Sequence, residues 1–113
     1  MAPYEPVTQE ILAQLEAIAP GRVTAGEDVN PDYGRDEMPI YGVHMPEAAV
    51  EVLSTEEAAA VVKLCYDHNI PVTTRGAGTG LVGGCVPLYG GVVLVTTRMN
   101  RILDYDLENF TVT

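Results

Sequence analysis

Basic residues are scarce in this sequence. Lys and Arg total 6 against 16 Asp and Glu in 113 residues, so the formal net charge is −10. A protein that binds nucleic acid by neutralising phosphates needs a basic face. Docking on an anionic membrane surface also needs clustered basic residues. The composition therefore argues against a nucleic-acid partner and against direct binding to anionic membranes.

Cysteine, histidine and long apolar runs are scarce as well. Cys65 and Cys85 are too few for a disulfide framework, and neither they nor His44 and His68 have the spacing of a metal site. No segment approaches the roughly 20 apolar residues that span a bilayer. Residues 1–5 lack the basic start of a secretory signal. We therefore expect a cytoplasmic protein with reduced thiols and no metal.

Charge and glycine are unevenly distributed along the chain. Residues 1–57 hold 12 acidic and 2 basic residues, whereas residues 58–113 hold 4 of each. Seven of the 11 glycines fall between Gly76 and Gly91. Because a neutral region repels an anion less than a strongly acidic one, the second half is the better candidate for an anionic ligand.

The first 45 residues predict one helix and an acidic arm. Thr8 is a candidate N-cap for a helix that runs to about Ala19 and stops at Pro20-Gly21. Residues 21–47 are interrupted by glycine and proline and carry several carboxylates. They predict an irregular, solvated arm that wraps something larger.

The rest of the chain predicts an α+β fold that contains a βαβ unit. A strand over 48–53 is followed by a capping box, Ser54 to Glu57, a helix to about 68–69, and a parallel strand over 71–74 reached by a right-handed crossover. Further strands are expected at 91–96, 102–106 and 109–113, with the last two forming a hairpin. The sequence stops inside the last of them, so we expect an N-terminal fragment whose unpaired edge favours self-association.

A glycine-rich loop lies between two of these strands. Residues 78–83 match G-x-G-x-x-G, and Asp104 follows 21 residues later. A Rossmann site needs a helix that opens at the loop. Two glycine pairs and Pro87 leave no room for that helix, and no Lys-Ser/Thr follows as in a P-loop. The sequence therefore argues against both of these nucleotide sites.

The density of glycine still favours an anion site. Five glycines in the nine residues 76–84 allow successive backbone N–H groups to converge on an anion without a helix. Arg75 and the Thr79 hydroxyl could add charge and a hydrogen bond. The alternative is a glycine-rich turn in tight packing. We favour binding of an anion or phosphate.

Residues 71–87 resemble the FAD pyrophosphate loop of FAD-linked oxidases with a PCMH-type FAD-binding domain, in the vanillyl-alcohol-oxidase superfamily. They are most similar to the group that contains the glycolate oxidase D-subunit, D-lactate dehydrogenase and D-2-hydroxyglutarate dehydrogenase. The resemblance continues through residues 90–94, 98–102 and 106–112, and it includes residues 33–36 and 45–50. One departure is Val52-Leu53, which stand where the family usually has a proline. We expect this departure to cause a local difference near the adenine side of the cofactor and no loss of fold.

This resemblance implies that residues 46–113 form the N-terminal part of the FAD-binding domain, in its first subdomain. Relatives with covalent FAD carry a His where Ala77 and Thr79 stand here, which implies noncovalent FAD. We expect residues 76–80 to cradle the pyrophosphate and residues 83–85 to run toward the flavin ring. The expected cofactor-binding residues are Arg75, Gly76, Ala77, Gly78, Thr79, Gly80, Gly83, Gly84 and Cys85.

The implied function is oxidation of a D-2-hydroxy acid, of the glycolate or D-lactate type, by hydride transfer to FAD. Iron–sulfur or other electron-transfer subunits are possible partners, and they could hold the protein at the inner face of a membrane. We expect the catalytic residues outside this chain and weak FAD binding by the chain alone. Tyr33, Arg35, Tyr41 and His44 are interpreted as surface or packing residues. The alternatives are an alditol or sugar oxidase, a flavin reductase, or a phosphate-binding module without catalysis.

Overall fold

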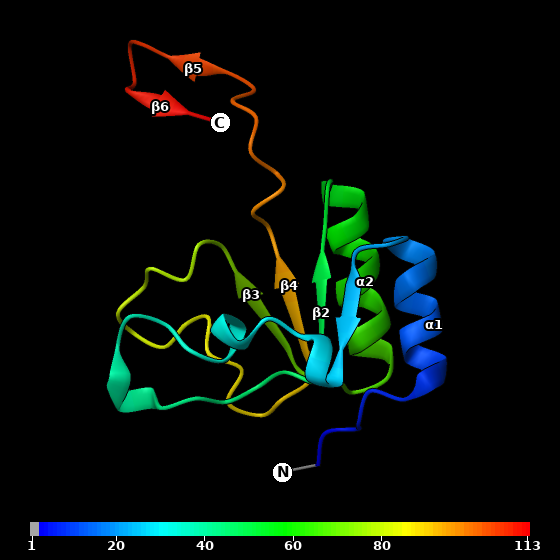
Figure 1. Cartoon of the computed structure of the whole chain (residues 1–113). Helices are drawn as coiled ribbons and strands as arrows, with labels where there is room; N and C mark the ends of the chain where they lie inside the picture. Colours follow the sequence, from blue (N-terminus) through cyan, green and yellow to red (C-terminus); the bar gives the residue numbers. More distant parts are fainter. Residues whose placement is uncertain (1–2) are drawn as a thin grey trace.

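The computed structural model describes residues 3–113, which form a four-stranded sheet with two helices and a separate hairpin (Figure 1). The order of strands in the sheet is β1-β2-β4-β3, with β1 antiparallel to β2 and the other pairs parallel. The elements are α1 (Gln9–Ile18), β1 (Val23–Ala25), β2 (Ala48–Glu51), α2 (Thr55–Asp67), β3 (Val72–Arg75), β4 (Val92–Val95), β5 (Tyr105–Asp106) and β6 (Thr111–Val112). This confirms the predicted α+β class.

The predicted βαβ unit is present, with a third strand inserted into it. β2 and β3 are parallel, but both pair with β4, which lies between them: Ala48 and Val72 each stand opposite Val92. All four residues of β4 are buried. A continuous apolar run is typical of a strand covered on both faces, and the central position of β4 explains it.

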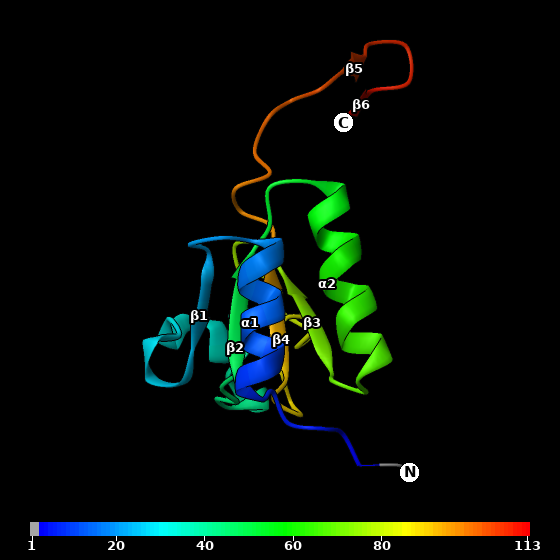
Figure 2. The ribbon, with the colours of Figure 1, turned by 90° about the vertical axis from the view of Figure 1, so that its right-hand side faces the viewer.

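The two faces of the sheet are covered by different parts of the chain. Figures 1 and 2 show α1 and α2 packed side by side on one face, while the arm and the glycine-rich loop lie on the other side. Alternate residues of β4 serve the two faces, because side chains along a strand point in opposite directions. The helical face buries Leu15, Val50, Val61 and Leu94 among others. The opposite face buries Val29, Ala49, Val93 and Val95, with Tyr33 packed against them.

The arm is therefore more structured than predicted. The prediction of an irregular, solvated segment over 21–47 is wrong for β1 and for three 3-10 helices, Gly26–Asp28, Pro31–Gly34 and Pro39–Tyr41. Val29 is 2% exposed and Gly34 is also buried. A three-residue strand leaves almost no periodic signal, and its partner β2 lies more than 20 residues away.

Local capping signals were predicted well, with one exception. The Thr8 and Ser54 side chains each accept a hydrogen bond from the backbone N–H three residues on, as N-caps do. Asn69 has φ +53°, the left-handed conformation expected at the end of α2. The capping box does not close, because the Glu57 carboxylate accepts the N–H of Leu53 rather than that of Ser54.

Glu57 instead joins helix α2 to the start of β1. Arg22 donates two hydrogen bonds to its carboxylate, at 2.7 and 2.6 Å, and a third to the carbonyl oxygen of Glu51. The hydrogen bonds from Arg22, and then that from Leu53, lower the pKa of Glu57 to about 2. A two-point ion pair of this kind fixes geometry as well as adding energy.

The hairpin of β5 and β6 stands apart from the sheet, at the end of an extended linker (Figures 1 and 2). Its strands are shorter than the predicted 102–106 and 109–113, because the turn between them takes four residues and includes Phe110 at φ +54°. Asp106 holds the turn by accepting the N–H groups of Glu108 and Asn109. Within residues 3–113, we find no helix of the length and hydrophobicity that crossing a membrane requires.

Candidate functional site

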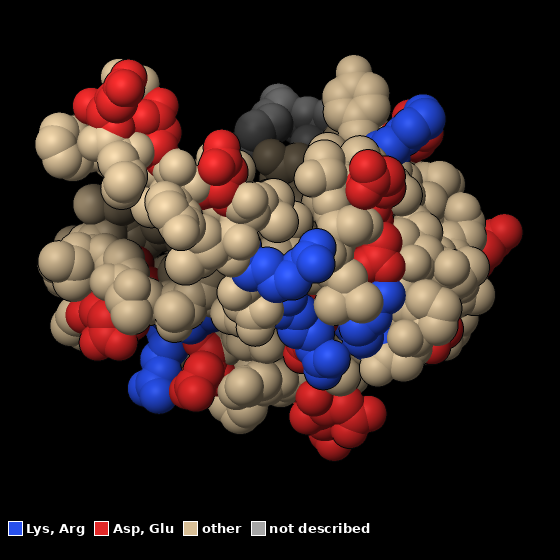
Figure 3. Space-filling view, turned by 90° about the horizontal axis from the view of Figure 1, so that it is seen from above, with Lys and Arg blue, Asp and Glu red and all other residues tan. Residues whose placement is uncertain are grey.

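The glycine-rich loop begins at the carboxyl end of β3. In open sheets with parallel strands, ligands bind at the carboxyl ends of the strands. The sheet is seen from that end in Figure 3, where basic side chains gather in the middle of the face and acidic ones lie around them. Arg98 and Arg101, which follow β4, line a hollow of about 680 Å³ on this side. The region is thus less acidic than the net charge of the chain would suggest.

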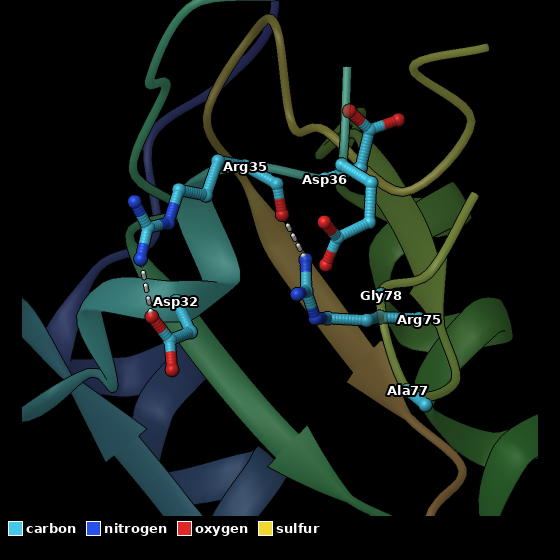
Figure 4. Close-up of a pocket in the computed structure, with 7 residues that line it drawn as sticks. Asp32, Arg35, Asp36, Arg75, Ala77 and Gly78 are labelled. Atoms are coloured by element: carbon cyan, nitrogen blue, oxygen red, sulfur yellow. Dashed lines mark hydrogen bonds and ion pairs between the residues drawn. The ribbon is translucent and has the colours of Figure 1, made fainter. Parts of the chain in front are cut away.

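Arg75, the last residue of β3, lies beneath the loop rather than on its surface. Its side chain donates to the carbonyl oxygen of Arg35 at 2.6 Å (Figure 4). It also donates to the sulfur of Cys85 at 3.5 Å. Its guanidinium carbon is 5.5 Å from the centre of the Tyr33 ring. The residue is 6% exposed. The sequence predicts Arg75 beside the loop, but nothing in its pattern reveals that Arg75 joins the loop to the arm.

The charge of Arg75 has no close acidic partner. Among residues 3–113, four ion pairs within 4.0 Å are formed, and none involves Arg75. The carboxylates of Asp32, Asp36 and Glu37 line the same hollow between the loop and the arm as Arg75, but they do not pair with it. A buried charge without an ion-pair partner is costly, and an anion placed against the guanidinium would offset that cost.

Two glycines of the loop are required by the folded chain itself. Gly78 has φ +77°, and a Cβ there would overlap the guanidinium of Arg75. Gly83 has φ +75°, and a Cβ there would come within 3.0 Å of the Tyr41 ring. Both the backbone conformation and the packing exclude a side chain at these positions. Their glycines are explained without any ligand.

Three other glycines of the loop are not explained in this way. A Cβ at Gly76 would have no neighbour closer than 3.9 Å, and one at Gly80 or Gly84 would have none within 4 Å. None of the three has a positive φ. Since glycine costs more backbone entropy on folding than any other residue, its use here needs another reason. The open space in front of the backbone fits a group that approaches from outside.

A hollow of about 320 Å³ lies between the loop and the arm. The loop contributes Ala77 and Gly78 and the arm contributes Asp32 and Glu37, with Arg75 exposing an edge into it (Figure 4). Arg35 and Asp36 complete its lining. Ala77 and Thr79 are exposed on the loop, as the prediction of a backbone-lined site requires.

The arm also holds the loop through the backbone. The carboxylate of Asp36 accepts the N–H of Gly83 at 2.8 Å, and the N–H of Glu37 donates to the carbonyl oxygen of Gly80 at 3.2 Å. Farther along, the carboxylate of Glu47 accepts the N–H of Gly91 at 2.9 Å. These contacts could not be predicted from the sequence, because a hydrogen bond across more than 40 residues leaves no pattern of spacing.

The remaining candidates are the two cysteines, which are free thiols in different surroundings. Cys85 is half-buried beside Arg75, whereas Cys65 is buried in the helical core, where burial raises its pKa to about 11. Cys65 is therefore a protonated core residue at neutral pH. Over residues 3–113, no group of three or more His, Cys, Asp or Glu side chains is placed to hold a metal ion.

Comparison with known proteins links this geometry to one cofactor. The sequence model of the FAD binding domain family matches residues 46–113. The chain is 55% identical over 109 residues to a D-lactate dehydrogenase of Anaerostipes hadrus, and 37% identical over 93 residues to the glycolate oxidase subunit GlcD of Bacillus subtilis. These matches cover 96% and 82% of this chain but 23% and 18% of the relatives. The chain thus spans about a fifth of the length of these curated relatives.

A solved structure shows a similar arrangement of the backbone. The structure of p-cresol methylhydroxylase with bound substrate superposes with a TM-score of 0.74 at 29% sequence identity. The superposition covers 94% of this chain and 22% of that one. The fold of this chain therefore recurs as part of a much longer protein.

Proposed function

The chain belongs to the FAD binding domain family, and from that premise we propose that its glycine-rich loop holds the pyrophosphate of noncovalent FAD. The observation that carries the proposal is the open backbone at Gly76, Gly80 and Gly84, where neither φ nor packing requires glycine. The proposed cofactor-binding residues are Arg75, Gly76, Ala77, Gly78, Thr79, Gly80, Gly83, Gly84 and Cys85. The match over 46–113 supports a division between the N-terminal helix and acidic arm, 1–45, and the N-terminal part of the FAD-binding domain, 46–113.

The residues contribute in different ways. Within residues 3–113, the backbone N–H groups of 76–80 donate to no other group of the chain, and Thr79 is exposed beside them. Arg75 supplies positive charge from below, and its hydrogen bonds to the Arg35 carbonyl oxygen and the Cys85 sulfur keep it in place. Gly78 lets the chain pass over the guanidinium. Neither Ala77 nor Thr79 offers a His for covalent attachment, which supports noncovalent binding.

For the whole protein we propose oxidation of a D-2-hydroxy acid of the D-lactate or glycolate type. The names of the relatives at 55% and 37% identity support this substrate class. Bound FAD supplies the acceptor for the hydride, and residues 3–113 bind and orient it. Because one relative is named as a subunit, we also propose a protein partner for electron transfer. A cytoplasmic location stays a prediction.

The test is a reduction experiment on the intact protein, purified without added flavin and then supplied with FAD. We expect a flavin absorption spectrum that bleaches under anaerobic conditions with D-lactate or glycolate, and that stays unchanged with L-lactate as the matched control. Bleaching by an alditol alone would instead support a sugar oxidase. A protein that never takes up FAD would contradict the proposal.

A further inference from the structure

Asp36 is the arm residue most closely tied to the glycine-rich loop. One oxygen of its carboxylate accepts the N–H of Gly83 at 2.8 Å, and the other accepts the N–H of Met38 at 2.7 Å. The first bond links residues 47 positions apart, and the second fixes the carboxylate to its own segment of the arm. Both oxygens are therefore committed to backbone donors, which holds the side chain in one orientation.

The arm is hydrogen-bonded to the loop at two places, Gly80 and Gly83. The N–H of Glu37 donates to the carbonyl oxygen of Gly80 at 3.2 Å, three residues before the point that Asp36 binds. The Tyr41 ring closes over Gly83. Between the two points, Leu81 and Val82 project into solvent, 59% and 78% exposed. They contribute little packing of their own, so the arm is what fixes this stretch.

We propose that Asp36 is a positioning residue for the cofactor, one that orders the loop before FAD binds. The inference rests on the proposed function. Glycine-rich backbone has much conformational freedom to lose, and freedom that is already lost in the free protein need not be lost on binding. Asp36 also occupies the N–H of Gly83, so this group is not a donor to the pyrophosphate.

A carboxylate at this place is otherwise unexpected. It adds negative charge beside a loop that accepts an anion, which on charge alone weakens binding. Its two backbone hydrogen bonds give a reason for it, because hydrogen bonds to a charged acceptor are stronger than neutral ones. Positioning and repulsion therefore predict opposite effects when the charge is removed, and a substitution can separate them.

The experiment compares three variants of the intact protein: D36A, D36N and, as the control, E27A. Glu27 is an exposed carboxylate of the same arm and does not line the hollow. We expect D36A to bind FAD at least about tenfold more weakly, as expected for a lost charged hydrogen bond. D36N should lie between D36A and the wild type, because an amide keeps one acceptor oxygen. E27A should stay within about twofold of the wild type.

Hydrogen exchange of the FAD-free protein provides a readout that does not depend on the cofactor. We expect D36A to exchange faster at residues 80–84, while the amide groups of β2, β3 and β4 keep their protection. Equal FAD affinity in D36A and wild type would overturn the inference, as would tighter binding by D36N or faster exchange across the whole sheet. If the wild type binds no FAD, the proposed function fails, while the exchange comparison still tests whether Asp36 orders the loop.

Discussion

Two glycine-rich segments follow β3, and they differ in what requires their glycines. In the second segment, Gly90 and Gly91 have φ of +74° and +69°. A Cβ at Gly91 would overlap the carbonyl oxygen of Pro71, which accepts the N–H of Val92. In the first segment, Gly76 and Gly80 have neither constraint. Glycine can thus be required by the backbone conformation and packing, as at Gly91, or by neither, as at Gly76 and Gly80. Only the glycines without such a requirement point to a ligand.

The same contrast occurs between adjacent residues. Gly83 is constrained by its positive φ, by the Tyr41 ring and by Asp36, whereas Gly84 is free of all three. In the sequence the two glycines look alike. In the structure, an added Cβ at Gly83 would contact the Tyr41 ring, whereas one at Gly84 would contact nothing, which leaves the backbone of Gly84 open to the cofactor.

The largest effect on stability is expected at Gly91, where both φ and packing require glycine. In Gly91→Ala, the added methyl group overlaps the carbonyl oxygen of Pro71, just before β3, and alanine is strained at φ +69°. We expect a loss of about 3 kcal/mol or more of unfolding free energy. Urea unfolding followed by circular dichroism measures it. A variant as stable as the wild type would mean that Gly91 is not required by the fold.

The adjacent pair sharpens the contrast within the loop. Gly83→Ala should destabilise the protein by about 1–3 kcal/mol, because of strain at positive φ and the contact with Tyr41. Gly84→Ala should leave stability unchanged or raise it by up to about 1 kcal/mol, since alanine restricts the unfolded chain. Thermal melts of the two variants compare them directly. Equal melting temperatures would erase the distinction that we draw.

A smaller effect is expected from the ion pair between helix α2 and the start of β1, which includes no residue of the loop. Glu57→Gln removes the charge that pairs with Arg22 and should cost about 1 kcal/mol at neutral pH without changing FAD affinity. The pKa of Glu57 is lowered in the folded state, so its contribution is complete above the unfolded value near 4.5 and disappears toward pH 2. Unfolding of both proteins from pH 7 to 2 tests this. A gap between them that persists at pH 2 would contradict it.

Much of the fold was predictable because it depends on local signals. Thr8, Ser54 and Asn69 mark helix ends through their own side chains, and the apolar run of β4 predicts burial on both faces. The strand β1 was missed because three residues carry no periodicity and pair with a distant partner. The Glu57 carboxylate was assigned to a capping box, whereas Arg22, 35 residues earlier, takes it instead.

The sequence predicted the position of the loop but not its backbone conformation or its contacts with the arm. Glycine density and the absence of room for a helix after Gly84 predicted a strand-to-strand anion loop, and the structure has turns there followed by β4. The sequence could not tell Gly78 and Gly83 from Gly76, Gly80 and Gly84, since the difference lies in φ and in distant side chains. Nor could it show that Arg75 is buried, because Tyr33 and the Arg35 carbonyl come from the arm.

The most direct test of the central claim is an FAD titration of Gly80→Ala in the intact protein, with the melting temperature of the FAD-free form measured alongside. The Cβ meets nothing within 4 Å, so folding should be undisturbed. The methyl group would stand where the pyrophosphate approaches the backbone, and we predict FAD affinity at least about tenfold below the wild type. FAD binding equal to the wild type in a normally folded variant would contradict the account.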